Sequence, residues 1–202
     1  MEHHVLAIMA KSPEKGKVKT RLAETIGDDD ALVVYKNLLS YTIREANCAL
    51  WETTVYWAGN FKNDVNIHDF KSTSQKGDDL GERMSYGFTQ EFENGAERVV
   101  MIGADCAEIT MQHIERAFGM LKIHDVVIGP ATDGGYYLIA MNEIHNELLN
   151  AVPWSTEHVL ETTKELAEEN HLSIGYLETL SDVDHASDLE KHSWLLQEKS
   201  EK

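Results

Sequence analysis

The chain has 202 residues, of which 42% are hydrophobic and 26% are charged, with 13 Gly and only 3 Pro. This composition predicts one globular domain over residues 1–202 and excludes collagen-like, mucin-like and wholly disordered chains. The 35 Asp and Glu outnumber the 18 Lys and Arg, which gives a formal net charge of -17 at pH 7. Such a surface repels a polyphosphate backbone, so we expect no nucleic-acid partner. A small phosphate compound bridged by a metal ion is compatible with it.

Cysteine and histidine usage narrows the class of protein further. Cys48 and Cys106 match no CxxC or zinc spacing, which predicts two reduced thiols in a cytoplasmic protein. The ten histidines form no HExxH pattern, and no Ser-His-Asp or Cys-His arrangement is readable in order. The apolar run after Met1 is too short for a signal peptide, and nowhere do 18 apolar residues follow one another. We therefore expect no membrane span.

The first half of the chain alternates predicted strands and helices. Three apolar runs predict buried strands, at residues 5–10, 51–58 and 98–103. Apolar residues at helical spacing predict one helix that Asp28 or Asp29 caps and that runs to Ala46, and another helix over residues 80–92. Residues 59–77 are polar and predict irregular structure.

The second half continues this alternation. Thr110 caps a predicted helix that reaches Leu121, and residues 125–129 predict a fourth strand. Residues 136–141 lie too close behind that strand for a helical crossover, so they form either its hairpin partner or an edge strand. Three further elements are predicted: a helix from Ser155 to about residue 170, a strand near residues 174–177 and a helix over residues 185–199.

Alternating strands and helices predict an α/β fold, with a mostly parallel sheet and helices on both faces. The nearly continuous apolar character of the first, third and fourth strands fits burial on both sides. No internal repeat and no linker divides the chain. In open sheets of this kind, ligands bind beyond the carboxyl ends of the strands, so the loops that follow the strands are the candidate site.

The loop after the first strand, residues 11–21, carries five basic residues in an acidic chain. It matches neither the GxxxxGK[ST] nor the GxGxxG pattern of phosphate-binding loops. One interpretation is a flexible loop that closes on phosphates with lysine point charges and an arginine fork. The alternative, at about even weight, is a loop whose cations are simply solvated. Residues 11–20 of this loop are rich in Lys.

Two further segments carry aspartates that are candidate metal ligands. Asp105 follows the third strand in a turn of small residues, where one carboxylate can bind Mg²⁺ or Mn²⁺ together with phosphate oxygens. Helix capping explains Asp105 less well, because Asp105 lies five residues before Thr110. Asp182 and Asp184 form a DxD pair near the end of the chain. For Asp184, capping of the helix that follows is a roughly equal alternative to metal binding.

The loop after the fourth strand holds Asp133, Gly134 and Gly135. Two adjacent glycines allow positive φ and close approach of a ligand to the backbone, which suits the floor of a binding site. An Asp-Gly pair between extended runs also favours a hairpin turn, and the two interpretations are compatible.

Several motifs together carry a family resemblance. They are KTRLA at residues 19–23, GDDLGERM at 77–84, IGADC at 102–106, GPATDGGYYL at 129–138, VPWST at 152–156 and DVD at 182–184. In this order the chain resembles the bacterial DUF2064 proteins, often labelled glycosyltransferases, of the nucleotide-diphospho-sugar transferase (GT-A) superfamily. The resemblance covers almost the whole chain. Each motif alone is weak, and the combination is specific.

The resemblance implies a GT-A fold, a Rossmann-like three-layer sandwich whose first half binds the nucleotide. It implies that Lys19 and Arg21 hold the nucleotide phosphates and that Asp105 holds Mg²⁺ or Mn²⁺. Similarity to the phospholactate guanylyltransferases, which often have an Asp-Thr-Pro-Glu-Asp-Leu segment, implies that Asp184 is a second metal ligand. The remaining residues implied to bind the nucleotide are Ala10, Lys11, Gly81, Arg83, Gly134 and Gly135.

The sequence departs from the family pattern at two points. Ala107 stands where the family usually has Pro, which predicts a more mobile metal loop, and Asp105 lacks the second aspartate of a full DxD motif. Trp154 either shapes the acceptor pocket or, more commonly for a tryptophan, belongs to the core. Asp133 is the candidate for binding the acceptor or acting as its base.

The function predicted from these residues is transfer from a nucleotide-activated donor to a small-molecule acceptor. Glycosyl transfer from a nucleoside-diphosphate sugar ranks first by a small margin. Nucleotidyl transfer from a nucleoside triphosphate to a phosphorylated acceptor is the alternative, favoured by the basic loop. A catalytically silent nucleotide-binding module is a third possibility, motivated by the two departures from the family pattern.

Overall fold

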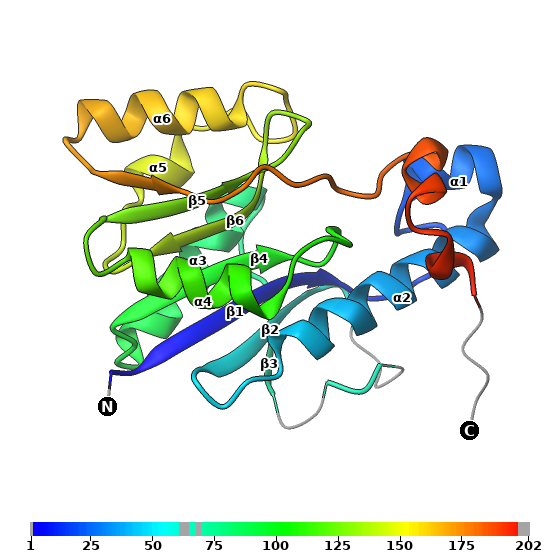
Figure 1. Ribbon diagram of the computed structural model, residues 1–202, viewed down its shortest axis with the longest axis horizontal. Helices are drawn as coiled ribbons and strands as arrows, with labels where there is room; N and C mark the ends of the chain where they lie inside the picture. Colours follow the sequence, from blue (N-terminus) through cyan, green and yellow to red (C-terminus); the bar gives the residue numbers. More distant parts are fainter. Residues whose placement is uncertain (1, 61–64, 68–69, 198–202) are drawn as a thin grey trace.

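The computed structural model describes residues 2–60, 65–67 and 70–197, and within them one seven-stranded sheet forms the centre of the molecule (Figure 1). Its strand order is β3-β2-β1-β4-β6-β5-β7. Neighbouring strands are parallel except in the two pairs that involve β6. The strands are β1 (His4–Lys11), β2 (Glu52–Ala58), β3 (Lys71–Ser74), β4 (Arg98–Gly103), β5 (Val126–Pro130), β6 (Tyr136–Met141) and β7 (Ile174–Tyr176).

Helices cover both faces of this sheet and complete a three-layer sandwich, as predicted. Helices α2 and α4 pack on one face, and α3, α5 and α6 pack on the other. The helices are α1 (Thr20–Ile26), α2 (Asp28–Ala46), α3 (Leu80–Glu93), α4 (Met111–Met120), α5 (Glu147–Asn150) and α6 (Val159–Glu169), followed by the 3-10 turns η1 (Ala186–Glu190) and η2 (Ser193–Leu196). None of the helices in the described part of the chain has the length and apolarity needed to cross a bilayer.

The central strand β1 is apolar along its length because both of its faces are buried. Leu6 and Ile8 belong to the cluster under α2 and α4, whereas Val5 and Ala7 belong to the cluster under α3, α5 and α6. Period-two alternation along the strand sends consecutive side chains to opposite faces, so an unbroken apolar run is the pattern expected of a central strand.

A third apolar cluster lies beside the sheet and joins helices α1 and α2 to the C-terminal segment. In Figure 1 the C-terminal segment, in orange and red, leaves β7 and reaches α1. There it packs side chains of α1, α2 and the 3-10 turns around the loop that follows β4. The buried members are Leu22, Val34, Leu38, Ala107, Val183, Leu189 and Leu195. Ala107, expected in a mobile loop, is therefore a buried packing residue.

Three short elements were absent from the sequence prediction: β3, α1 and the four-residue helix α5. Strand β3 lies inside the polar stretch 59–77 and is fully exposed, so it shows no apolar pattern. It forms by pairing in parallel with β2 at the edge of the sheet. Helix α1 has seven residues, and only Leu22 among them is buried. An amphipathic stripe needs more turns than this to be visible in a sequence.

Three predicted elements differ from the structure. Strand β6 is the hairpin partner of β5, but it also pairs with β4, so the edge-strand alternative was wrong. Helix α6 begins at Val159, because Ser155 has a φ of 65° that an α-helix does not allow. The helix predicted over residues 185–199 was wrong, because the described part of that range forms η1 and η2 around two separate buried anchors, Leu189 and Leu195.

Candidate functional site

The carboxyl ends of β1, β2 and β4 meet at one edge of the sheet, because these strands are parallel neighbours. The basic loop leaves β1 at this edge. Its first residue, Lys11, is fixed through its backbone: the buried Tyr35 hydroxyl of α2 donates to Lys11 O at 2.8 Å and accepts from Lys11 N at 2.7 Å. Burial raises the pKa of Tyr35, so its hydroxyl keeps the proton that it donates.

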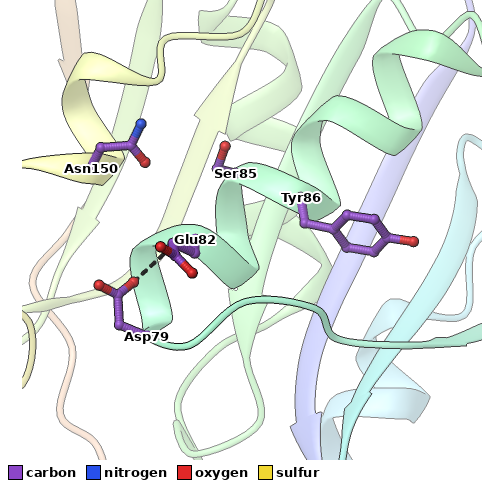
Figure 2. A pocket seen from close by; sticks show the side chains of 5 residues that line it. All are labelled: Asp79, Glu82, Ser85, Tyr86 and Asn150. Atoms are coloured by element: carbon purple, nitrogen blue, oxygen red, sulfur yellow. Dashed lines mark hydrogen bonds between the residues drawn. The ribbon is translucent and has the colours of Figure 1, made fainter.

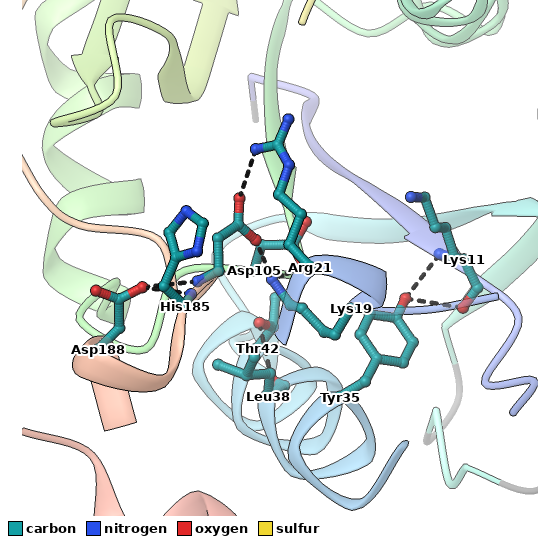
Figure 3. Close-up of polar contacts among 10 residues, drawn as sticks. Lys11, Lys19, Arg21, Tyr35, Leu38, Thr42, Asp105, His185 and Asp188 are labelled. Atoms are coloured by element: carbon teal, nitrogen blue, oxygen red, sulfur yellow. Dashed lines mark hydrogen bonds and ion pairs between the residues drawn. The ribbon is translucent and has the colours of Figure 1, made fainter. Parts of the chain in front are cut away.

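Lys19 lies at the centre of the edge that the carboxyl ends of the strands form. Figure 3 shows it together with Arg21 and Asp105. Its Nζ lies 2.7 Å from Asp105 Oδ1 and 3.0 Å from Asp184 Oδ1, and only 4% of its side chain is exposed. Lys19 also caps α1 with a left-handed backbone, φ 48°. The ammonium group thus joins the loop after β1, the loop after β4 and the C-terminal segment.

The C-terminal segment reaches this edge through backbone pairing. Beside β5, Leu180 N donates to Pro130 O, and further along Val183 N donates to Asp105 O at 3.1 Å. An isolated antiparallel bridge between Cys106 and Asp182 holds the two segments in register. Asp184 is therefore placed opposite Asp105 by the backbone, and Val183 is anchored in the third cluster.

Helix capping explains neither Asp105 nor Asp184. Asp188 Oδ2 accepts from the backbone N of Asp184 and His185, so Asp188 caps the turn η1. Thr110 and His113 form the capping box of α4. The carboxylates of Asp105 and Asp184 are left to contact Lys19.

The charges at this edge depend on one another. Burial lowers the pKa of Lys19, but Asp105 and Asp184 outweigh burial, so the net pKa is raised and the side chain is an ammonium. Burial opposes ionisation of Asp184, yet Lys19 holds the pKa of Asp184 below its usual value. Asp182 behaves in the opposite way: burial, followed by the charge of Asp105, raises its pKa to about 7. The sequence singled out Asp184 by resemblance, and the structure separates it from Asp182 by its ion pair with Lys19.

The other basic residues of the loop differ in what they contact. Lys15 pairs with Asp29 at 2.7 Å and Lys17 pairs with Glu14 at 2.6 Å, and both pairs are solvated. The solvated-loop interpretation therefore describes these two lysines. Arg21 is 66% exposed, and its Nη1 lies 3.8 Å from Asp184 Oδ2, so its guanidinium is within reach of a ligand at the carboxylates.

The loop between β5 and β6 combines a turn with an acidic side chain. Asp133 Oδ1 accepts from Gly135 N at 2.9 Å, and Asp133 is one of the charges that raise the pKa of Asp182. Gly134 has a φ of 89°, and a Cβ there would lie 2.2 Å from Glu157 O. The glycine is required by close packing, and Asp133 is exposed.

The remaining predicted nucleotide-binding residues have structural contacts. Ala10 O accepts from Gln75 Nε2 at 3.2 Å, and Arg83 Nε donates to Gly77 O at 3.0 Å. A Cβ on Gly81 would lie 2.1 Å from Leu149 O, so α3 and α5 pack directly against each other there. Nucleotide binding by these residues stays a prediction.

Trp154 belongs to the same packing region. Its Nε1 donates to Leu149 O at 3.1 Å, and its ring packs edge-to-face on Tyr136. This favours the core role for Trp154.

A cavity of about 390 Å³ lies beside α3, on the helix that carries Gly81 and Arg83 (Figure 2). Two carboxylates in it already cap the helix, since Glu82 N donates to Asp79 Oδ1 and Asp78 N donates to Glu82 Oε2. Ser85 Oγ is hydrogen-bonded to Asn146 Oδ1. The lining residues are Asp79, Glu82, Ser85, Tyr86 and Asn150.

Asp105 and Asp184 have the donor chemistry that a hard divalent cation requires. Their oxygens already converge on one cationic nitrogen, and both side chains are partly exposed to solvent. Mg²⁺ is typically held by one or two carboxylates together with phosphate oxygens and water. In the described residues no group of three or more His, Cys, Asp or Glu side chains is arranged as a metal site. The pair thus fits an ion that arrives with a phosphate ligand.

Comparison with known proteins identifies the fold and the family. The fold is that of the nucleotide-diphospho-sugar transferases, the GT-A fold. The chain belongs to the family described as "Uncharacterized protein conserved in bacteria (DUF2064)", whose sequence model matches residues 42–156. The resemblance that the motifs indicated is therefore confirmed.

Individual relatives agree with this assignment. A candidate nucleotide-diphospho-sugar transferase from Desulfovibrio desulfuricans G20 is 25% identical, with 97% of each chain covered and a TM-score of 0.85. Glucosyl-3-phosphoglycerate synthase from Mycobacterium tuberculosis, solved with Mn²⁺ and UDP, is 12% identical over 96% of this chain and 76% of its own, with a TM-score of 0.53, and shows the fold alone.

A curated sequence relative is the 2-phospho-L-lactate guanylyltransferase of Methanocaldococcus sp. (strain FS406-22). It is 30% identical over 126 residues, which are 60% of this chain and 52% of the relative. The chain thus spans about half the length of that relative. This relative and the Desulfovibrio desulfuricans protein both carry the name of a transferase.

Proposed function

We propose that residues 1–202 form one transferase domain that moves a nucleotidyl group from a nucleoside triphosphate to a small acceptor that carries a phosphate. One observation carries the proposal: Lys19, Asp105 and Asp184, from three distant parts of the chain, meet at the carboxyl edge of the sheet. A buried cation between two carboxylates, with Arg21 beside them, provides the polarity that a metal-bridged phosphate group requires.

The cations have distinct roles in this proposal. Lys19 and Arg21 bind the phosphate oxygens, Lys19 as a point charge and Arg21 as a planar fork. Both groups stabilise the negative charge that grows on the leaving pyrophosphate. Tyr35 keeps the start of the loop in place at the end of β1, through two hydrogen bonds with the backbone of Lys11.

Asp105 and Asp184 are the residues that would hold Mg²⁺ or Mn²⁺. A divalent ion held there would supply positive charge to offset the negative charge of a phosphate ligand. Asp133 lies on the side of β5 and β6, within electrostatic range of Asp182. We assign Asp133 to the acceptor, either as a hydrogen-bond partner or as the base that takes a proton from the attacking group.

The products of the reaction test this proposal. The protein is incubated with Mg²⁺, each of the four common nucleoside triphosphates and a panel of phosphorylated hydroxy acids and sugars, and pyrophosphate release is followed. We expect release that depends on the acceptor and falls at least about a hundredfold in Asp105→Asn. Asp29→Asn is the matched control, since Asp29 pairs with the exposed Lys15. Absence of pyrophosphate with every pair would contradict nucleotidyl transfer.

Glycosyl transfer from a nucleoside-diphosphate sugar is the second candidate function. The similarity to the candidate nucleotide-diphospho-sugar transferase over nearly the whole chain favours it. The guanylyltransferase relative and the cations of the loop at residues 11–21 favour nucleotidyl transfer. Release of a nucleoside diphosphate from a nucleotide sugar, without pyrophosphate release from any triphosphate, would reverse the order.

A further inference from the structure

The most constrained charge in the described part of the chain is the ammonium of Lys19. It lies between the two carboxylates that fit a divalent ion. We propose that Lys19 is a built-in cation that keeps Asp105 and Asp184 closed to a metal until the phosphates of a ligand draw it away. Metal and nucleotide would then bind together rather than in sequence. This inference rests on the proposed function, because it assumes that the two carboxylates hold the metal.

The contact geometry supports this role. Lys19 Nζ approaches one oxygen of Asp105 at 2.7 Å and one oxygen of Asp184 at 3.0 Å. A metal held by the same two oxygens would have to share their immediate surroundings with the ammonium. Two cations this close repel each other strongly in a partly desolvated site, so the ion and the ammonium compete for the carboxylates.

Solvent access differs between the partners. The side chain of Lys19 is only 4% exposed, whereas the side chains of Asp105 and Asp184 are 49% and 38% exposed. A metal from solvent can therefore reach the carboxylates, but it meets an ammonium that is already in place. A buried ammonium needs a compensating anion, so it leaves the carboxylates readily only if another anion takes their place.

The loop around Lys19 has the means to provide that exchange. Lys19 has a left-handed backbone with φ 48°, a conformation that an L-residue adopts at a cost and that the surrounding contacts must maintain. The exposed guanidinium of Arg21 lies 3.8 Å from the second oxygen of Asp184. A polyphosphate that enters beside Arg21 would offer Lys19 new anionic partners and leave the carboxylates free for the metal.

The proposal is tested by titrating the protein with Mn²⁺ alone. Electron paramagnetic resonance measures the concentration of the free ion. We expect weak binding to the wild-type protein and at least about tenfold tighter binding to Lys19→Met. Lys15→Met is the matched control, because it removes an equal charge from the same loop at an exposed pair. Equal affinities in Lys19→Met and Lys15→Met would overturn the proposal, since only general electrostatics would then remain.

A second measurement uses tripolyphosphate, which has the triphosphate charge without a base. Tripolyphosphate should tighten Mn²⁺ binding to the wild type by at least about tenfold more than it does in Lys19→Met, because the variant has no ammonium to displace. The same enhancement in both proteins contradicts the gating role.

A small-molecule rescue covers the case in which Lys19→Met does not fold. In Lys19→Ala, added n-propylammonium should occupy the vacated space and weaken Mn²⁺ binding, whereas it should have no effect on Lys15→Ala. Lack of competition in Lys19→Ala argues against the proposal. If Mn²⁺ binds neither the wild type nor any variant even with tripolyphosphate, the metal role in the proposed function fails too. If Mn²⁺ does bind, and binds Lys19→Met and Lys15→Met with equal affinity, only the gating role of Lys19 is overturned.

Discussion

Two loops at the same edge of the sheet are built in opposite ways. The basic loop at residues 11–21 reaches distant segments through Lys19, which contacts residues that follow β4 and β7. The loop at residues 131–135 closes on itself, since Asp133 accepts from Gly135 N and Ala131 N donates to Gly135 O. The first loop meets distant segments through charged side chains, whereas the second meets them through its backbone, since Thr132 N donates to Leu180 O and Gly134 O accepts from Leu160 N.

This contrast indicates where each kind of substitution should act. Changes in the basic loop and its distant partners should alter binding and rate, because the ion pairs assemble a charge distribution. Changes in the second loop should alter stability first, because its glycine is required by packing. The predictions that follow test this division.

The largest expected effect belongs to Asp105. In Asp105→Asn we expect the kcat/KM of the transferase to fall by about a hundredfold to a thousandfold, because charge stabilisation at the leaving phosphates is lost. Steady-state kinetics with Mg²⁺ measures it. The folded state should persist, since the amide can still contact Lys19. A loss below fivefold, with intact folding, would place the reaction elsewhere.

Gly134→Ala should have the next largest effect, on stability. The new Cβ would lie 2.2 Å from Glu157 O at a φ of 89°. Gly95→Ala is a matched control, because Gly95 has a φ of 92° and no atom within 4 Å of the added Cβ. We expect Gly134→Ala to lower the free energy of unfolding by about 1–3 kcal/mol more than Gly95→Ala, in urea denaturation. Equal losses would mean that the backbone moves freely there.

The same division explains what the sequence could predict. Continuous apolar runs predicted the strands near residues 5–10 and 98–103, and apolar residues at helical spacing predicted the helix to Ala46. Both patterns are local in the sequence. Strand β3 could not be found, because its exposed residues acquire strand structure only by pairing with β2. The helix predicted over residues 185–199 failed for a related reason, since tertiary anchors rather than periodicity determine its turns.

The candidate site shows this limit more clearly. Asp105 and Lys19 stood out by their position after strands, and Asp184 by its resemblance to a metal-binding segment. Their convergence on one ammonium could not be read from the chain, because it depends on the bridge between Cys106 and Asp182. The contacts that separate Asp182 from Asp184 likewise exist only in the folded state: Lys19 lowers the pKa of Asp184, whereas burial and Asp105 raise the pKa of Asp182.

An effect of similar size at high pH, which fades as the pH falls, is expected from Asp182→Asn. The folded-state pKa of Asp182, about 7, lies above its unfolded value, so the folded protein retains a proton that the unfolded chain loses as pH rises. Wild-type stability should therefore fall between about pH 4 and pH 7 relative to the variant and level off above. In metal-free buffer we expect Asp182→Asn to be more stable at pH 8 by about 1–3 kcal/mol.

Denaturation at several pH values checks this prediction, with the exposed Asp30→Asn as control. The difference between Asp182→Asn and wild type should grow from pH 5 to pH 8, whereas the Asp30→Asn difference should stay flat over that range. A flat difference for Asp182→Asn would show that its carboxyl ionises as it does in water.

The smallest effect is expected from Lys15→Met. Lys15 pairs with Asp29 in solvent, on the same loop as Lys19 but away from the carboxylates of the site. Exposed ion pairs contribute little to stability, so the melting temperature and kcat/KM should stay within error of wild type. A tenfold loss of kcat/KM would extend the phosphate site along the loop to Lys15.

The central claim is that Asp105 and Asp184 couple a metal to the phosphates held by Lys19 and Arg21. Calorimetric titration with ATP, CTP, GTP and UTP, with and without Mg²⁺, tests it most directly. For the triphosphate that binds best, we predict at least about tenfold tighter binding with Mg²⁺ in the wild type and no effect of Mg²⁺ in the Asp105→Asn/Asp184→Asn double variant. An equal effect of Mg²⁺ in both proteins would contradict the claim.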